Sequence, residues 1–174
     1  MKPISEILRV AAPFATAENI AKYANYLEIF MPKYGIDTTL RQRHFLAQVL
    51  HESGSLRYVR ELASGEAYEG RKDLGNTQPG WGVAYKGRGL LQISGHANYL
   101  ACSRALFGDN TLLLQPELLE QPRYAVESAC WFWKANNLNA LADKDDIVAV
   151  TKRINGGTNG LESRKSFYDK LQIV

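Results

Sequence analysis

The stretch DTTLRQRHFLAQVLHESGSLRYVRE, residues 37–61, predicts a helix, the place where it ends and a turn after it. One of residues 37–39 can cap the helix, because Asp and Thr side chains accept hydrogen bonds from free backbone N–H groups. Gly54 favours a stop soon after Glu52. The apolar residues of the inward face recur at helical spacing: Leu40, Leu46, Val49 and Leu50.

Two glutamates, Glu52 and Glu61, flank this turn. On one unbroken helix they would point to opposite faces, about 13 Å apart along the axis. If the chain reverses after Gly54, Glu61 can approach Glu52. Partial burial at the end of an apolar helix would favour a protonated Glu52, whereas Arg57 or Arg60 would favour an ionised Glu61. Such a pair suits glycoside cleavage, although most single glutamates are solvated surface residues.

The rest of the chain is predicted to be mainly helical, because apolar spacing near 3.6 residues dominates and no alternating strand pattern occurs. Residues 64–90 are rich in glycine and predict a long loop region, which in a compact domain is either disordered or functional. Further helices are expected over residues 4–11, 20–30, 122–133, 147–154 and 161–171 and in the second half of 92–107.

Composition favours one compact domain. The 174 residues are 45% apolar, and a net charge of +3 with a pI near 8.8 is too mild to indicate nucleic-acid binding. Cys102 and Cys130 stand in apolar helical contexts and are expected to be buried reduced thiols. The N-terminal apolar stretch is interrupted by charges and a proline, so neither a signal peptide nor a membrane span is predicted.

Three segments resemble glycoside hydrolase family 19, which contains plant and bacterial chitinases and a branch of phage endolysins. They are HESG at 51–54, KGRGLLQISGHANY at 86–99 and RINGGTNGLESR at 153–164, joined by LGNTQPG at 74–80. The short gap between the two glutamates is more similar to the endolysin branch. The resemblance implies a mainly α, lysozyme-like helical domain whose glycine-rich loop region lines a substrate cleft. Residues 1–174 would then be a single catalytic domain without a separate wall-binding domain.

The resemblance also implies roles for single residues. Glu52 matches the general acid, Glu61 the general base, and Ser94 the hydroxyl that holds the attacking water. Gln92, Asn98 and Asn155 match positions that contact sugar in the family. Arg164 matches an arginine near the cleft that helps organise the two glutamates. From the residues alone, Gln92, Ser94 and Asn98 could instead cap the following helix, and Asn155 could simply end one.

Two aromatic residues are candidate sugar contacts, whereas the histidines are not candidate metal ligands. Trp81 stands where many endolysin relatives carry an acidic residue, and with Tyr85 it is a candidate for stacking on a sugar ring. Trp131, Phe132 and Trp133 cover more than one helix face and are expected in the core. No second ligand is spaced to form a metal site with His51 or His44, so neither a metal nor a cofactor is expected.

The predicted function is hydrolysis of β-1,4 bonds in bacterial peptidoglycan by an inverting endolysin. The chain would act as a monomer on glycan strands of the cell wall or periplasm, without inserting into the membrane. The resemblance further implies that it would be made in the host cytoplasm and released by a holin-like protein. The alternatives are a chitinase, a lytic transglycosylase that needs no Glu61, a non-catalytic glycan-binding domain, and an antibacterial toxin with the same active site.

Overall fold

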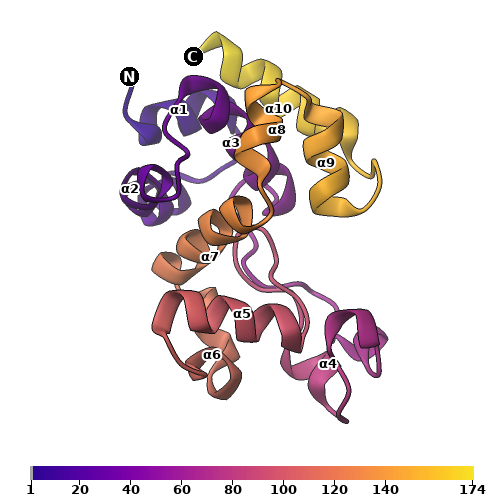
Figure 1. The fold of residues 1–174 in the computed structure, drawn as a ribbon. Helices are drawn as coiled ribbons and strands as arrows, with labels where there is room; N and C mark the ends of the chain where they lie inside the picture. Colours follow the sequence, from indigo (N-terminus) through magenta and orange to yellow (C-terminus); the bar gives the residue numbers. More distant parts are fainter. Residues whose placement is uncertain (1) are drawn as a thin grey trace. The chain divides into compact units, whose positions relative to one another are not determined.

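A computed structural model of the chain describes residues 2–174 and divides them into two compact units (Figure 1). The first unit combines residues 2–57 with residues 133–174, and the second is Tyr58–Phe132. Within the described residues, regular structure is helical apart from two isolated antiparallel bridges, Arg60 with Arg88 and Arg88 with Ile93. The prediction of a mainly α fold is therefore confirmed.

The first unit is built around α3 (Thr39–Glu52). Thr38 caps this helix, since its side chain accepts a hydrogen bond from the N–H of Arg41 at 3.1 Å. Every residue from His44 to Leu50 is buried, and α3 packs against three other helices of this unit. These helices are α8 (Leu138–Asp143), α9 (Ile147–Asn155) and α10 (Leu161–Ile173).

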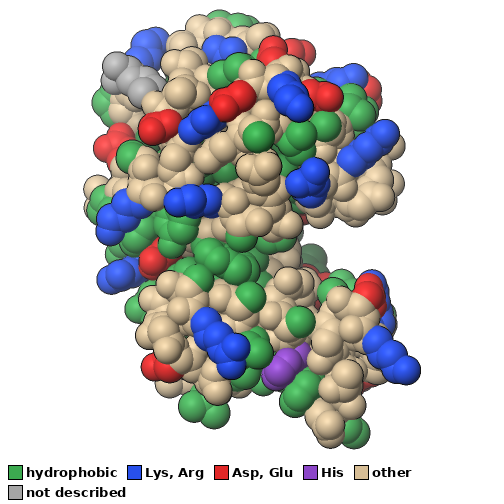
Figure 2. Space-filling model, in the orientation of Figure 1, with side chains coloured by type: hydrophobic (Ala, Val, Ile, Leu, Met, Phe, Trp, Pro, Cys, Tyr) green, Lys and Arg blue, Asp and Glu red, His purple; other side chains and the backbone are tan. Residues whose placement is uncertain are grey.

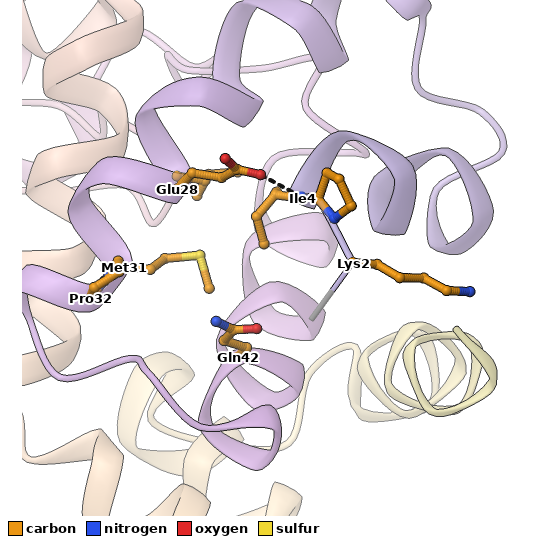
Figure 3. A pocket seen from close by; sticks show the side chains of 8 residues that line it. Lys2, Ile4, Glu28, Met31, Pro32 and Gln42 are labelled. Carbon is orange, nitrogen blue, oxygen red and sulfur yellow. Dashed lines mark hydrogen bonds between the residues drawn. The ribbon is translucent and has the colours of Figure 1, made fainter.

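The N-terminal segment completes this unit with α1 (Ile4–Ala11) and α2 (Ala17–Lys33). Helix α1 packs on α2 and α10. Its first N–H, on Ile4, donates to Oε1 of Glu28 at 2.8 Å, so a side chain from α2 caps the start of α1 (Figure 3). A cavity of about 370 Å³ lies beside this contact, lined by Lys2, Pro3, Ile4, Leu27, Glu28, Met31, Pro32 and Gln42.

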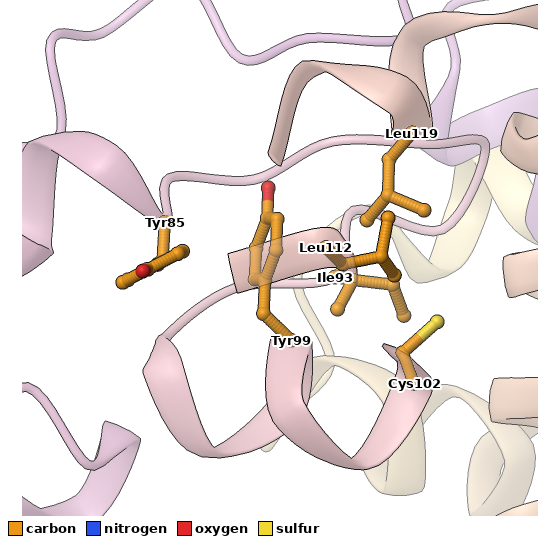
Figure 4. Packing of buried hydrophobic residues seen from close by; sticks show 6 residues of the cluster. All are labelled: Tyr85, Ile93, Tyr99, Cys102, Leu112 and Leu119. Carbon is orange, nitrogen blue, oxygen red and sulfur yellow. The ribbon is translucent and has the colours of Figure 1, made fainter. Parts of the chain in front are cut away.

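The second unit has its own apolar core (Figure 4). It contains α5 (His96–Phe107), α6 (Thr111–Leu114), the 3-10 helix η3 (Pro116–Glu120) and most of α7 (Pro122–Ala135), whose last residues belong to the first unit. The core residues come from α5, α6, η3 and the segment before α5: Tyr85, Ile93, Tyr99, Cys102, Leu112 and Leu119. Cys102 and Cys130 are both buried and unbridged, which confirms the expected free thiols.

The segment predicted to be a long loop contains three short helices, so that prediction is wrong in part. They are η1 (Glu66–Tyr68), η2 (Lys72–Leu74) and α4 (Trp81–Ala84). A Cβ on Gly65 would lie 2.5 Å from the carbonyl oxygen of Gly82, and a Cβ on Gly82 would lie 2.5 Å from the nitrogen of Glu69. The glycines are there because short helices pack backbone to backbone, not because the segment is a loose loop.

The surface charges are mixed. Basic and acidic side chains are interspersed on the face shown in Figure 2. Among the described residues, no helix is both long and apolar enough to span a bilayer.

Candidate active site

Glu52 is the last residue of α3, and a buried turn fixes the chain directly after it. Gly54, Ser55 and Leu56 all have positive φ, at 57°, 60° and 67°. Left-handed conformations are costly for Ser and Leu and persist only where the surroundings compensate. Ser53 provides part of this compensation, since its hydroxyl donates to the Val49 carbonyl at 2.6 Å and accepts from the Leu56 N–H at 2.9 Å. The predicted stop at Gly54 is confirmed.

The carboxylate of Glu52 is paired with a buried arginine. Nη2 of Arg164 lies 2.8 Å from Oε1 of Glu52, and the Arg164 side chain is only 1% exposed. Its other two nitrogen groups donate to protein oxygens: Nη1 to Oε1 of Gln48 at 2.6 Å, and Nε to the Asn159 carbonyl at 3.2 Å. All of these residues lie in the first unit. Arg164, which the resemblance implied would help organise the glutamates, therefore pairs with Glu52.

His51, beside Glu52, is fixed by α10. Its Nδ1 lies 2.9 Å from the hydroxyl of Ser163, and its ring packs so closely on Gly160 that a Cβ there would overlap the imidazole. Burial lowers the pKa of His51, and the positive charge of Arg164 lowers it further. In the part of the chain that the structure describes, no group of three or more His, Cys, Asp or Glu side chains could hold a metal ion.

Asn155 ends α9 at the loop that leads to Arg164. Gly156 follows in the left-handed conformation that closes the helix. Oδ1 of Asn155 accepts from the N–H of Asn159 at 3.3 Å, and the Asn155 side chain is exposed. Asn155 thus ends a helix and orders the loop whose carbonyl, at Asn159, holds Arg164.

Glu61 lies in the second unit and has a different set of partners. Its Oε1 accepts from the N–H of Gly87 at 2.5 Å, and its Oε2 accepts from the hydroxyl of Tyr68 at 3.0 Å. Burial and the bond to Glu61 raise the pKa of Tyr68. Arg60, expected to favour the ionised form of Glu61, pairs instead with Glu120 at 3.8 Å. Sequence reasoning missed Tyr68, because it falls in the segment predicted to be a loop.

Ser94 and Gln92 lie close to the same glycine that holds Glu61. A Cβ placed on Gly87 would be 2.7 Å from Oε1 of Gln92 and 3.2 Å from Oγ of Ser94. Gln92 has a positive φ of 59°, and its amide donates to the Gly89 carbonyl at 2.9 Å. The structure thus gathers three of the predicted site residues, Glu61, Gln92 and Ser94, around Gly87.

The capping interpretation of this segment does not fit Ser94. The residue at the N-cap of α5 is Gly95, and the first N–H of the helix, on His96, donates to Oδ1 of Asn76 at 2.9 Å. Asn98, in the first turn of α5, donates to the carbonyl of Ser94 at 2.8 Å, and its side chain is exposed. Ser94 donates to the Gln92 carbonyl over a long 3.3 Å, so this weak bond leaves its hydroxyl able to turn to another partner.

Arg88 holds the Gly87 segment in place. It forms the antiparallel bridges with Arg60 and Ile93, and its side chain is almost buried. The guanidinium donates to Glu120 at 3.0 Å, to the Ala84 carbonyl at 2.8 Å and to the hydroxyl of Tyr99 at 3.0 Å. Glu61 and the neighbouring Gln92 and Ser94 are therefore supported by backbone pairing and by a buried cation.

The two aromatic candidates for sugar stacking have different surroundings. Tyr85 is only 7% exposed, and its hydroxyl donates to the Leu113 carbonyl at 3.0 Å. Its ring is part of the core of the second unit, so the structure does not support a stacking role for Tyr85. Trp81 is partly exposed and lies parallel to the ring of His96, with 3.8 Å between centroids and 3° between planes. Only Trp81 keeps ring surface that a sugar could cover.

The chain is similar in sequence to several known proteins. No family model matches. A Haemophilus influenzae protein described as a glycosyl hydrolase family 19 domain-containing protein is 31% identical over 174 residues, which cover 82% of this chain and 84% of that protein. An Arabidopsis thaliana endochitinase, At2g43610, is 39% identical over 113 residues, which are 64% of this chain and 38% of that protein.

Solved structures share the fold. Chitinase C from Streptomyces griseus superimposes with a TM-score of 0.77 at 24% identity, over 99% of this chain and 77% of that one. A bacterial family 19 chitinase gives a TM-score of 0.77 at 22% identity, over 97% of this chain and 93% of that one. At these identities the likeness shows the fold alone. Because the Haemophilus relative matches over most of both chains, we conclude that this chain belongs to glycoside hydrolase family 19 and is a glycoside hydrolase.

Proposed function

We propose that the chain hydrolyses β-1,4 glycosidic bonds of bacterial peptidoglycan with inversion at the anomeric carbon. Glu52 would be the general acid and Glu61 the general base. The observation that carries the proposal is the arrangement around Gly87, where the Glu61 carboxylate, the amide of Gln92 and the hydroxyl of Ser94 meet. A carboxylate beside a hydroxyl that can hold water is what activation of a nucleophilic water requires.

The residue proposed for the acid step, Glu52, lies in the first unit. Glu52 would protonate the glycosidic oxygen as the bond to the leaving sugar breaks. Proton transfer leaves a carboxylate on Glu52, and the guanidinium of Arg164 lies 2.8 Å from that oxygen. The ion pair therefore stabilises the state of Glu52 that the reaction forms.

The residue proposed for the base step, Glu61, lies in the second unit. Glu61 would take a proton from a water that Ser94 holds, and this water would attack the anomeric carbon from the face opposite the leaving group. The Gly87 N–H and the Tyr68 hydroxyl fix both oxygens of Glu61, so little reorganisation is needed. An inverting mechanism requires the two carboxyl groups to lie about 6.5–9.5 Å apart around the bound sugar.

The mild positive charge of the chain is compatible with peptidoglycan as the substrate. The net charge is +3 and the pI is near 8.8, which favour approach to a polyanionic cell wall. The resemblance to phage endolysins points the same way. On this proposal the chain acts as a monomer on wall glycan, after release from the host cytoplasm by a holin-like protein.

Chitin is the second candidate. The plant relatives are named endochitinases, and the two solved structures are named chitinases. Both polymers are β-1,4-linked amino-sugar glycans, so the same acid and base would serve. The difference is the lactyl ether and the peptide on alternate sugars of peptidoglycan.

The test compares purified peptidoglycan with soluble chitin oligomers for four proteins: the wild type, Glu52→Gln, Glu61→Gln and the exposed control Glu117→Gln. We expect the wild type and the control to clear peptidoglycan and to leave chitin oligomers nearly unchanged. Each active-site variant should lose about 10²–10⁴-fold in rate. Faster turnover of chitin oligomers would replace the peptidoglycan proposal with the chitinase one.

The products separate the remaining alternatives. Mass spectrometry should find reducing ends that have gained water, and NMR should find the α-anomer first. Anhydro products together with an active Glu61→Gln variant would identify a lytic transglycosylase. Binding of either glycan without any turnover would identify a glycan-binding domain and contradict the proposal.

A further inference from the structure

We propose that Gln48 and Thr151 are positioning residues for the general acid, because they hold the Arg164 guanidinium in its place at Glu52. The inference rests on the proposed role of Glu52. It concerns three helices of the first unit, α3, α9 and α10, which meet at these side chains.

The contacts form one buried series of side-chain hydrogen bonds. The hydroxyl of Thr151 accepts from Nε2 of Gln48 at 3.2 Å, and Oε1 of Gln48 accepts from Nη1 of Arg164 at 2.6 Å. Nη2 of the same guanidinium then reaches Glu52 at 2.8 Å. Gln48 and Thr151 are both fully buried, so water cannot replace these partners without opening the core.

The orientation of the Gln48 amide is fixed by this series of hydrogen bonds. A flipped amide would present its NH₂ group to a guanidinium that can only donate, and that pairing is repulsive. In the observed orientation the oxygen faces Arg164 and the NH₂ group faces Thr151. Thr151 satisfies the donor that would otherwise be buried without a partner.

Gln48 is placed to act on Glu52 through the arginine. The two residues are four positions apart on α3, so their side chains lie on one face of the helix. The rigid fork of the guanidinium bridges them with Nη1 and Nη2. Helix α3 therefore supplies both the acid, Glu52, and Gln48, the side chain that orients the Arg164 guanidinium.

A neutral residue at position 48 also has an electrostatic consequence. Gln48 accepts a hydrogen bond from Arg164 but carries no charge. The positive charge of Arg164 is therefore balanced by the carboxylate of Glu52 and not by Gln48. A carboxylate at position 48 would share that charge and disfavour a second negative charge at Glu52.

The experiment uses the full chain and whichever of the two glycans the wild type hydrolyses. Gln48→Met keeps the size and removes the acceptor, and kcat should fall about tenfold while KM stays within about twofold. Gln48→Glu should move the alkaline limit of the kcat/KM profile to higher pH. Thr151→Val should lower kcat by less than Gln48→Met, and Thr151→Ser should restore it.

Controls separate positioning from stability. Ser103→Ala removes another buried hydroxyl, which donates to the Asp109 carbonyl in the second unit, and should lower the melting temperature but not kcat. In a Glu52→Gln background, Gln48→Met should cause no further loss of rate. A Gln48→Met protein that is less stable yet keeps the wild-type kcat and pH profile would overturn the proposal.

Failure of the proposed function would look different. If Glu52→Gln stays active, or neither glycan is cleaved, the assignment of Glu52 is wrong. The positioning contact is then tested without turnover by ¹³C NMR titration of the Glu52 carboxyl. Gln48→Glu should still move that titration to higher pH, and an unchanged titration curve would reject the contact.

Discussion

Glu61 and Gly87 form two hydrogen bonds, and each residue is the donor in one of them. The N–H of Glu61 donates to the Gly87 carbonyl at 2.9 Å, and the N–H of Gly87 donates to the Glu61 carboxylate at 2.5 Å. The backbone pairing that places Glu61 is thus accompanied by a bond that orients its side chain. Gln92 and Ser94 approach the same Cα so closely that only a hydrogen fits on the side facing them.

Gly87→Ala should therefore abolish most activity while the protein still folds. The new methyl would lie 2.7 Å from Oε1 of Gln92 and 3.2 Å from Oγ of Ser94, so both side chains must move away from the base. A displacement of about 1 Å at a reacting group costs on the order of 10²-fold. Turnover and the melting temperature should be measured on the same preparation.

Gly108→Ala is the matched control. It ends α5 with a φ of 76°, and nothing lies within 4 Å of the position a Cβ would take. This substitution should cost about 1–2 kcal/mol of stability through backbone strain and leave turnover unchanged. Wild-type turnover in Gly87→Ala would contradict the placement of Ser94 and Gln92 beside the base.

Tyr68→Phe should lower kcat by about tenfold. The hydroxyl of Tyr68 donates to Glu61, as the Gly87 N–H does, and hydrogen bonds to charged groups contribute about 1.5–3 kcal/mol. The Gly87 N–H remains, so activity should not vanish. Tyr124→Phe, in the same unit, should have no effect on turnover. Equal kcat in all three proteins would mean that Tyr68 does not orient the base.

Protonation of the histidines should destabilise the protein in mild acid. His44 is fully buried, and burial lowers its pKa although Asp145, bonded to Nε2 at 2.7 Å, acts in the opposite direction. A base with a folded pKa below its unfolded value, about 6.5, contributes stability that is complete above about pH 6.5. This stability is lost as the pH falls through the folded pKa.

His44→Gln tests this directly. The free energy of unfolding should fall between about pH 7 and pH 5 in the wild type and fall less in the variant. Some pH dependence should remain, because burial also lowers the pKa values of His51 and His96. Asp145, whose pKa is lowered mainly by its bond to Tyr168, titrates below this range. An unchanged pH dependence in His44→Gln would show that His44 is not the group responsible.

Local sequence patterns predicted the helices, but they did not predict the partners of the glutamates. The periodicity of Leu40, Leu46, Val49 and Leu50 was sufficient to predict α3, and Gly54 marked its end. Arg164, by contrast, reaches Glu52 from more than a hundred residues away, and spacing carries no information about such a contact. Nearness in sequence pointed to Arg60 as a partner of Glu61, yet Arg60 pairs with Glu120.

The glycine-rich segment was misread for a related physical reason. Glycine signals a loop in general, but here Gly65 and Gly82 allow close packing between short helices. Tyr85 was predicted as a candidate for stacking on a sugar ring and lies in the core instead. Its neighbour on α4, Trp81, is partly exposed and stacks on the ring of His96.

The two aromatic residues should therefore respond differently to substitution. Trp81→Ala should raise KM for the polymer several-fold with little change in kcat, since stacking on a sugar contributes to binding and not to proton transfer. Tyr85→Phe removes the bond to the Leu113 carbonyl and should lower the melting temperature without changing KM. If Trp81→Ala binds and cleaves glycan as the wild type does, its stack on His96 is purely structural, and the sugar must be held by polar groups such as Gln92 and Asn155.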